Sequence, residues 1–383
     1  MMMVASRRTL LAAAIALLAL AAAYQIKGNV DLIAGETPGS AVDLRNRDME
    51  QAYFAAGKNP HDYMEGTHAP WAYPFGALLT WPEWPAVRVY WAALNLVALA
   101  FLMWWAYRQP RDATPEARLL LAGAAAAFGG ACTATEVGQV SIIVTALLAG
   151  ALWLDAAGRP YWCGLLVGCS MIKPTIAAPF ALALIAAGRY RAAAAAAGYG
   201  VAATAATWLL TGTAPFIMIE QMSVAAARYV TAGTLGLVDL AVLLGASHAA
   251  AVWLPLLIAV PALVLMAAVR PSLSLCFAIA AVWGRNWTYH KSYDDVMLVF
   301  LLIPLGVLAV GSARSRTAAI AFFAIGVLAW IPGRLLALDA IQLAQLAAWP
   351  AALLVLVGLS SREVVLGRHF VNLRRTAGAS HSH

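Results

Sequence analysis

The stretch SRRTLLAAAIALLALAAA, residues 6–23, sets two arginines directly before an uncharged apolar run. Basic residues beside an apolar helix mark its cytoplasmic end, so residues 9–23 are expected to form a helix inserted from the cytoplasm. The alanine-rich end of the run also resembles the cleavage site of a secretory signal peptide. We favour a retained anchor, because a protein with many membrane helices needs no separate signal.

Apolar segments recur along the whole chain. Hydrophobic residues make up 63% of the sequence and charged residues 11%, whereas soluble domains carry about 25% charged residues. A surface with so few charges cannot face water, so lipid is the main solvent. Further helices are expected at residues 86–107, 119–132, 139–154, 162–172, 175–187, 192–210, 250–269, 273–284, 295–312, 317–331 and 343–359. The sequence thus predicts an all-α polytopic membrane protein with about 11–12 membrane helices in one domain over residues 1–383.

Two adjacent segments, 162–172 and 175–187, are too short to span the membrane twice and are separated by Lys173-Pro174. Broken helices are tolerated at membrane depth where they are buried in protein or line a cavity. We therefore expect half-helices or a re-entrant element at this point.

Residues 25–85 form the one long polar stretch of the sequence, rich in Gly, Pro, Asp, Asn and Trp. Loops of this length are usually functional or disordered. The Trp and Tyr residues favour an ordered loop at the membrane surface, where aromatic rings settle at headgroup level. We expect these rings to be interfacial anchors rather than sugar-stacking platforms, and the loop to contribute to an active site.

The basic residues set the orientation of the helices. With the N-terminus inside, fifteen Lys and Arg residues fall on the cytoplasmic side and nine on the opposite side, and Lys173 is left within the membrane. Cytoplasmic loops carry the excess of basic residues, so both termini are expected in the cytoplasm and residues 25–85 outside a plasma (inner) membrane. The other outer segments are expected near residues 133–138, 211–247, 284–294 and 332–342.

Several function classes lack support in the sequence. The net charge of +7 comes from singly scattered residues, without the Lys/Arg-rich runs that bind nucleic acid. The four cysteines lie in apolar segments without the spacing of metal ligands. A glycine-rich phosphate loop is missing, which argues against a nucleotide-sugar or ATP site. No cofactor and no metal site are predicted.

Ionisable residues at membrane depth usually serve a function, because burying them in lipid is costly. Here the ionisable and amide side chains gather towards the outer side, in the first loop and beside three later helices. The candidates are Asp43, Asp48, Gln139, Lys173, Asn286, His290, Lys291 and Asp294.

Three motifs occur in an order that resembles the polyprenol-phosphate-sugar glycosyltransferases of family 87, in the GT-C superfamily of mannosyl- and arabinofuranosyltransferases. The motifs are Val42-Asp43-Leu44 with Asn59-Pro60 and Tyr73-Pro74, then Gly138-Gln139-Val140 with Ile172-Lys173-Pro174, then Trp287-Thr288-Tyr289-His290. The likeness covers about residues 9–310. It departs from the family at His61, where tyrosine is common, and at Phe75, which replaces the second proline of Tyr-Pro-Pro.

The resemblance implies transfer of a sugar, mannose first among the candidates, from a polyprenyl-phosphate donor to a glycan or glycolipid acceptor on the extracytoplasmic face. Such a reaction needs a base for the acceptor hydroxyl and cations for the departing phosphate. The match at Val42-Asp43-Leu44 makes Asp43 the expected base. Asp48 is the reserve candidate, on a different face if the segment is helical.

The other candidates are expected to hold the substrates. Lys173, His290 and Lys291 would bind the donor phosphate through positive charge. A snorkelling lysine and an interfacial histidine are the alternative interpretations. Sugar or acceptor contacts are expected from Asp48, Gln139, Asn286 and Asp294.

Two other functions are consistent with the sequence. A secondary transporter also combines broken helices with a buried lysine, but transporters tend to show two similar halves and no convincing repeat is evident here. A non-catalytic or polymerase-like protein that handles lipid-linked envelope glycans would share the polar outer face. Only an assay separates that protein from a transferase.

Overall fold

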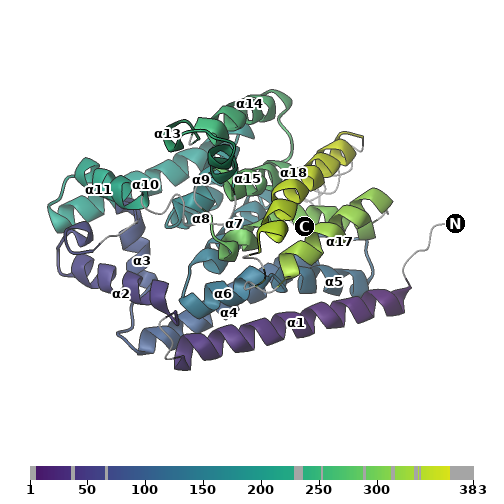
Figure 1. Cartoon of the computed structure of the whole chain (residues 1–383), viewed down its shortest axis with the longest axis horizontal. Helices are drawn as coiled ribbons and strands as arrows, with labels where there is room; N and C mark the ends of the chain where they lie inside the picture. Colours follow the sequence, from purple (N-terminus) through teal and green to yellow (C-terminus); the bar gives the residue numbers. More distant parts are fainter. Residues whose placement is uncertain are drawn as a thin grey trace, which may run out of the picture.

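The computed structural model describes residues 6–35, 39–64, 68–227, 236–251, 253–287, 290–311, 315–331, 335 and 338–362. Within these ranges every regular element is a helix and no strand occurs (Figure 1). The predicted all-α class is confirmed.

The elements follow one another as α1 (Arg7–Ala34), α2 (Val42–Ala55), η1 (Pro60–Asp62), η2 (Pro70–Ala72), α3 (Tyr73–Leu79), α4 (Ala86–Arg108), α5 (Pro115–Ala126), α6 (Gly129–Val137), α7 (Ser141–Ala156), α8 (Pro160–Ser170), α9 (Pro174–Ala186), α10 (Tyr190–Thr211), α11 (Pro215–Ala227), α12 (Leu237–Leu243), α13 (His248–Ala251), α14 (Trp253–Val269), α15 (Leu273–Asn286), η3 (Ser292–Leu298), α16 (Val299–Val310), α17 (Arg316–Trp330) and α18 (Asp339–Arg362).

Five helical segments of the described chain are long and apolar enough to cross a bilayer: α1, α4, α10, the continuous stretch Ser292–Val310, and Ala340–Ser360 within α18. The pair α5 and α6, bent by 45°, would make a sixth span. Apolar helices of 10–17 residues, among them α7, α9 and α15, are shorter than the ~20 residues of a full span. The predicted polytopic membrane protein is confirmed, and its expected membrane helices divide into full spans and shorter segments.

The helix ends follow from local chemistry. α5 begins at Thr114-Pro115, where the threonine hydroxyl accepts a hydrogen bond from the Ala117 amide and proline takes the first helical position. The chain breaks between α8 and α9 at Lys173-Pro174, as predicted, because proline has no amide hydrogen with which to continue a helix. Lys173 therefore stands immediately before the first residue of α9.

The first helix is longer than predicted. It continues to Ala34 instead of ending near residue 23, so the loop is shorter than residues 25–85. The polar side chains of its last turns have partners, since Lys27 lies 2.5 Å from Asp31 one turn on and 3.1 Å from Glu136 of α6. Contacts with a distant helix thus support a helical end that the sequence pattern assigned to the loop.

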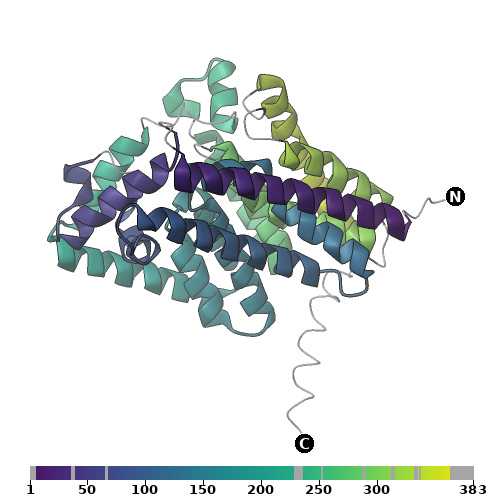
Figure 2. The ribbon, with the colours of Figure 1, turned by 90° about the horizontal axis from the view of Figure 1, so that it is seen from below.

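α1 runs along one side of the molecule and packs against α4, α5 and α6 (Figures 1 and 2). α7 packs between α4 and α8, and α8 packs on α10. The shortened loop is itself largely helical and supplies α2 and α3. Figure 1 shows α2, α3 and α11 together at the end of the molecule opposite the N-terminus.

Aromatic side chains fill the centre of the bundle. Phe180 of α9, Phe277 of α15 and Phe300 of α16 are buried and meet edge to face, with ring centroids 5.0, 5.2 and 5.6 Å apart. Each such pair contributes about 0.5–1.5 kcal/mol beyond the burial of its surface. This aromatic cluster fixes three helices, and Lys173, His290 and Asp294 lie in the segments that adjoin them.

Candidate functional site

A close contact between α2 and the end of α6 positions the first site residue. Gly138 ends α6 in the left-handed conformation, with a φ of 76°. A Cβ on this residue would stand 2.3 Å from the Leu44 Cβ. Glycine suits this position for two reasons: it adopts a positive φ without strain, and it has no Cβ to collide with Leu44. The contact brings Gln139 beside Asp43 in the first turn of α2.

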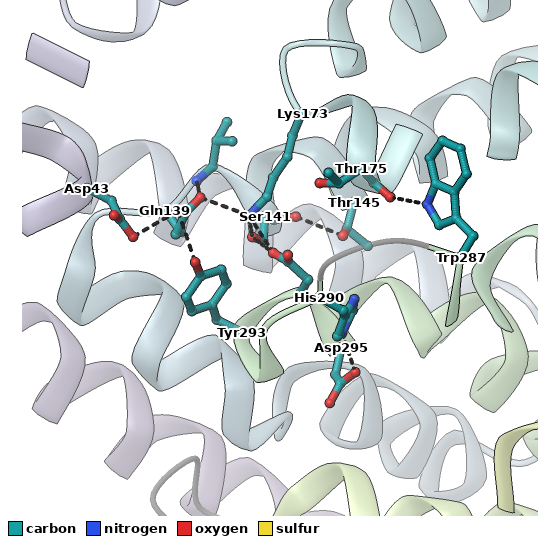
Figure 3. A network of polar contacts seen from close by, with 12 residues as sticks. Asp43, Gln139, Ser141, Thr145, Lys173, Thr175, Trp287, His290, Tyr293 and Asp295 are labelled. Atoms are coloured by element: carbon teal, nitrogen blue, oxygen red, sulfur yellow. Dashed lines mark hydrogen bonds and ion pairs between the residues drawn. The ribbon is translucent and has the colours of Figure 1, made fainter. Parts of the chain in front are cut away.

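Gln139 joins two charged groups. Its Nε2 donates a hydrogen bond to Asp43 Oδ2 at 2.8 Å, and its Oε1 accepts one from Lys173 Nζ at 2.9 Å (Figure 3). Only this orientation of the amide gives the carboxylate a donor and the ammonium an acceptor. Asp43 and Lys173, far apart in sequence, thus lie at the two ends of one side chain.

Lys173 is held by a buried carboxylate. Its Nζ lies 2.5 Å from Asp294 Oδ1, 3.1 Å from Ser141 Oγ and 4.7 Å from the centre of the Tyr293 ring. Ser141 Oγ also donates to Asp294 Oδ1 at 2.5 Å. The exposed fractions of the Asp294 and Lys173 side chains are 1% and 13%. The ammonium is therefore turned towards protein partners.

Three helices begin inside this network. Asp43 lies in the first turn of α2, Ser141 is the first residue of α7, and Lys173 directly precedes α9. Asp43 and Ser141 are about a hundred residues apart in the sequence, and Ser141 and Lys173 are about thirty apart. The network therefore joins three distant chain segments.

Asp295 organises a second cluster. Arg285 Nε and His290 Nε2 lie 2.9 and 2.8 Å from Asp295 Oδ1, and all three residues are buried. Burial and the charge of Arg285 lower the pKa of the His290 imidazole, against the opposing effect of Asp295. The adjacent Asp294 and Asp295 connect this cluster to the one around Lys173.

The remaining predicted site residues have other surroundings. Asn286 donates a hydrogen bond back to the Val282 carbonyl of its own helix, at 2.8 Å. Lys291 is half-buried and directly precedes η3. Asp48 follows Asp43 by five residues and therefore faces another direction on α2. Burial raises the pKa of the Asp48 carboxyl, although the nearby Arg45 opposes this.

The buried face of α2 carries two charged residues that the sequence analysis left without a role. Arg47 and Glu50 follow Asp43 at helical spacing, and only 4% and 3% of their surfaces are exposed. Glu50 Oε2 lies 2.5 Å from His68 Nδ1. Burial raises the pKa of the Glu50 carboxyl, but the charges of His68 and Arg47 bring it below its usual value. The spacing i, i+4, i+7 from Asp43 is the sequence signal that could have identified both.

Polar contacts order the loop around Asn59-Pro60. Asn59 Nδ2 donates to Asp62 Oδ1 at 3.0 Å and to Gln221 Oε1 of α11 at 2.9 Å, and Gln221 Nε2 donates to Asp62 Oδ1 at 2.9 Å. His61, at the position where the resemblance expects tyrosine, has its Nε2 3.3 Å from the Tyr73 hydroxyl. The loop is therefore tied to α11 and to α3.

Among the residues the structure describes, no three His, Cys, Asp or Glu side chains converge as metal ligands would. An apolar cavity lies elsewhere, between α4, α7, α15 and α16. Trp105, Leu152 and Phe300 line it, and no residue of the two clusters does.

Comparison with known families identifies the chain. The model of glycosyltransferase family 87 matches residues 67–285, more than half of the sequence. The matched range holds Gln139 and Lys173, the bridge and the cation of the site. No curated protein and no solved structure matches the chain. Because the family model covers most of the polytopic bundle together with these residues, this membrane protein belongs to glycosyltransferase family 87.

Proposed function

We propose that this glycosyltransferase moves a sugar, mannose in the first place, from a polyprenyl-phosphate donor to a glycan or glycolipid acceptor on the outer face of the plasma membrane. The observation that carries the proposal is the bridge of Asp43, Gln139 and Lys173, which holds a carboxylate and a cation at the two ends of one amide. The carboxylate can receive a proton from an acceptor hydroxyl, and the cation can stabilise a leaving phosphate.

In the proposed reaction Asp43 is the general base. It takes the proton of the acceptor hydroxyl while the hydroxyl oxygen bonds to the anomeric carbon of the donor sugar. The bond from that carbon to the phosphate oxygen breaks, and its electron pair leaves with the polyprenyl phosphate. Attack from the face opposite the phosphate inverts the anomeric configuration.

The other site residues are proposed to hold the donor and the acceptor. Lys173, His290 and Lys291 bind the phosphate, and the link of Lys173 to Asp43 through Gln139 supports its assignment. Gln139, Asp48, Asn286 and Asp294 are proposed contacts of the sugar or the acceptor. Asp294 also keeps Lys173 in place through the 2.5 Å ion pair.

A purified-enzyme assay tests the proposal. The protein is incubated with acceptor and with synthetic polyprenyl-phosphate mannose or arabinofuranose, and products are identified by mass spectrometry. We expect an acceptor heavier by one mannose and release of polyprenyl phosphate. A nucleotide-activated mannose serves as the control donor and should give no product.

The same preparation addresses the transporter alternative. In sealed vesicles, a secondary transporter would move a solute across the membrane without forming a glycosidic bond. Translocation with no product from any lipid-linked donor would overturn the proposed transfer.

A further inference from the structure

Arg47 is a buried cation that lacks a close partner of opposite charge. Only 4% of its surface is exposed, and its Nε has no hydrogen-bond partner. Within the described residues, no carboxylate oxygen lies within 4.0 Å of its guanidinium, whereas Lys173 and Arg285 have carboxylates at 2.5 and 2.9 Å. A buried charge left in this way is costly, so an anion would stabilise it.

The neighbouring acidic groups are engaged elsewhere. The Glu50 carboxylate contacts His68, and the Asp43 carboxylate accepts the Gln139 amide. The guanidinium instead lies 5.9 Å from the centre of the buried Trp91 ring. An aromatic ring attracts the guanidinium through the face of the ring. It accepts no hydrogen bond from the N–H groups, which lie in the guanidinium plane and stay unsatisfied.

The position of Arg47 relates it to the proposed reaction. It follows Asp43 by one helical turn, so both lie on the same side of α2. Asp43 is joined to Lys173 through Gln139, so Arg47, one turn further along the same side of α2, lies next to that network. Lys173 shares its charge with Asp294, whereas Arg47 has no such close carboxylate among the described residues, so Arg47 offers the site a second cation for an anion.

We infer that Arg47 binds the phosphate group of the lipid-linked donor, next to the sugar that faces Asp43. The inference rests on the proposed function and adds a ligand to it. A guanidinium can donate two parallel hydrogen bonds to a phosphate, a geometry that an ammonium does not offer. The ligand class is therefore a phosphate ester, and the lipid tail distinguishes the polyprenyl phosphate from a free phosphate.

Equilibrium binding separates these ligands without relying on catalysis. The purified full chain in detergent is titrated with farnesyl phosphate, with farnesol and with inorganic phosphate, and binding is followed by microscale thermophoresis. We expect wild type to bind farnesyl phosphate at least about tenfold more tightly than farnesol, since a hydrogen bond to a charged group contributes about that factor. Inorganic phosphate should compete weakly.

The decisive variant is Arg47→Gln, and Arg45→Gln is its matched control. Arg45 is an exposed residue of the same helix, so its replacement removes an equal charge without touching the buried face. We expect Arg47→Gln to bind farnesyl phosphate about tenfold more weakly with unchanged affinity for farnesol, and Arg45→Gln to bind both as wild type does. If Arg47 only stabilised the fold, its replacement would weaken the binding of farnesyl phosphate and of farnesol alike.

Each outcome has a distinct meaning. If Arg47→Gln keeps the wild-type preference, Arg47 is not a phosphate ligand, whether or not the protein transfers sugar. If wild type itself shows no preference for farnesyl phosphate, the lipid-phosphate donor of the proposed function is wrong. If Arg47→Gln does not fold, Arg47→Lys decides, because it keeps the charge and loses the paired donors. A several-fold weaker binding of farnesyl phosphate alone supports the inference, and unchanged binding overturns it.

Discussion

Gln139 keeps the carboxylate and the ammonium of the site from neutralising each other. Its amide stands between Asp43 and Lys173, so the lysine pairs with Asp294 instead. The uncharged spacer therefore holds the two charged groups close without letting them contact each other directly.

Asp43→Asn should lower kcat at least about a hundredfold, because general-base catalysis typically contributes about 10²–10⁴-fold. The variant keeps an oxygen that can accept the Gln139 hydrogen bond but cannot take the proton. Donor KM and the melting temperature should change little. Steady-state kinetics with the mannosyl donor measure this, and Asp48→Asn is made in parallel. A hundredfold loss in Asp48→Asn with normal turnover in Asp43→Asn would move the base to Asp48.

Lys173→Ala and His290→Ala should mainly raise the donor KM. Their charge or hydrogen bonds serve a phosphate that is present in the ground state as well as the transition state. A loss of about tenfold or more is expected for Lys173→Ala. Lys27→Ala on α1 is the control, since Lys27 pairs with Glu136 away from this network. Unchanged KM and kcat in both site variants would place the phosphate elsewhere.

At this scale the sequence identified single residues better than their partners. Asp43, Gln139, Lys173 and Asp294 were all predicted, and the structure brings them into one network. Ionisable groups in apolar surroundings stand out in a sequence, whereas their pairing depends on how the helices pack. Arg47 was given no role, because a loop arginine resembles many solvated arginines until its segment is known to be a buried helical face.

Among the elements, the junction of α6 and α2 controls where Asp43 lies. Gly138→Ala should reduce kcat and stability, because the new Cβ would meet the Leu44 Cβ at 2.3 Å and push α2 away. Gly158→Ala is a matched control. It has a similar φ of 72°, with nothing within 4 Å of the added Cβ.

Both glycine variants should lose about 1–2 kcal/mol of folding stability, because alanine is disfavoured in the left-handed conformation. Only Gly138→Ala should also lose activity. Thermal melting and initial rates measured on the same preparations test this. Equal activity in the two variants would show that the α2 contact does not position the base.

The elements themselves were largely predictable, and their ends were less so. The break at Lys173-Pro174 follows from proline chemistry that acts within one turn. The last turns of α1 are polar, which led to their assignment as loop. Contacts with distant residues support their helical state, among them the ion pair of Lys27 with Glu136 and the hydrogen bond from Arg88 to the Leu32 carbonyl. The local sequence pattern does not show the tertiary contacts that form when the helices pack.

For the molecule as a whole, the charge bias predicts that α2, α3 and the loop lie outside the cell. A cysteine-free background with Lys58→Cys should react with an impermeant thiol reagent on intact cells, since Lys58 is exposed. Arg111→Cys, in the exposed turn between α4 and α5, should react only after permeabilisation. The reverse pattern would invert the topology and exclude an external active site.

The three helices that begin inside the network have an electrostatic consequence. Each helix carries a macrodipole that places about half a positive charge at its N-terminus. α2, α7 and α9 therefore direct three positive ends at the space around Asp43 and Lys173. This attraction for an anion belongs to the backbone, so no side-chain substitution removes it. Replacing one cation of the site should weaken the hold on a phosphate and still leave a field that draws negative charge towards it.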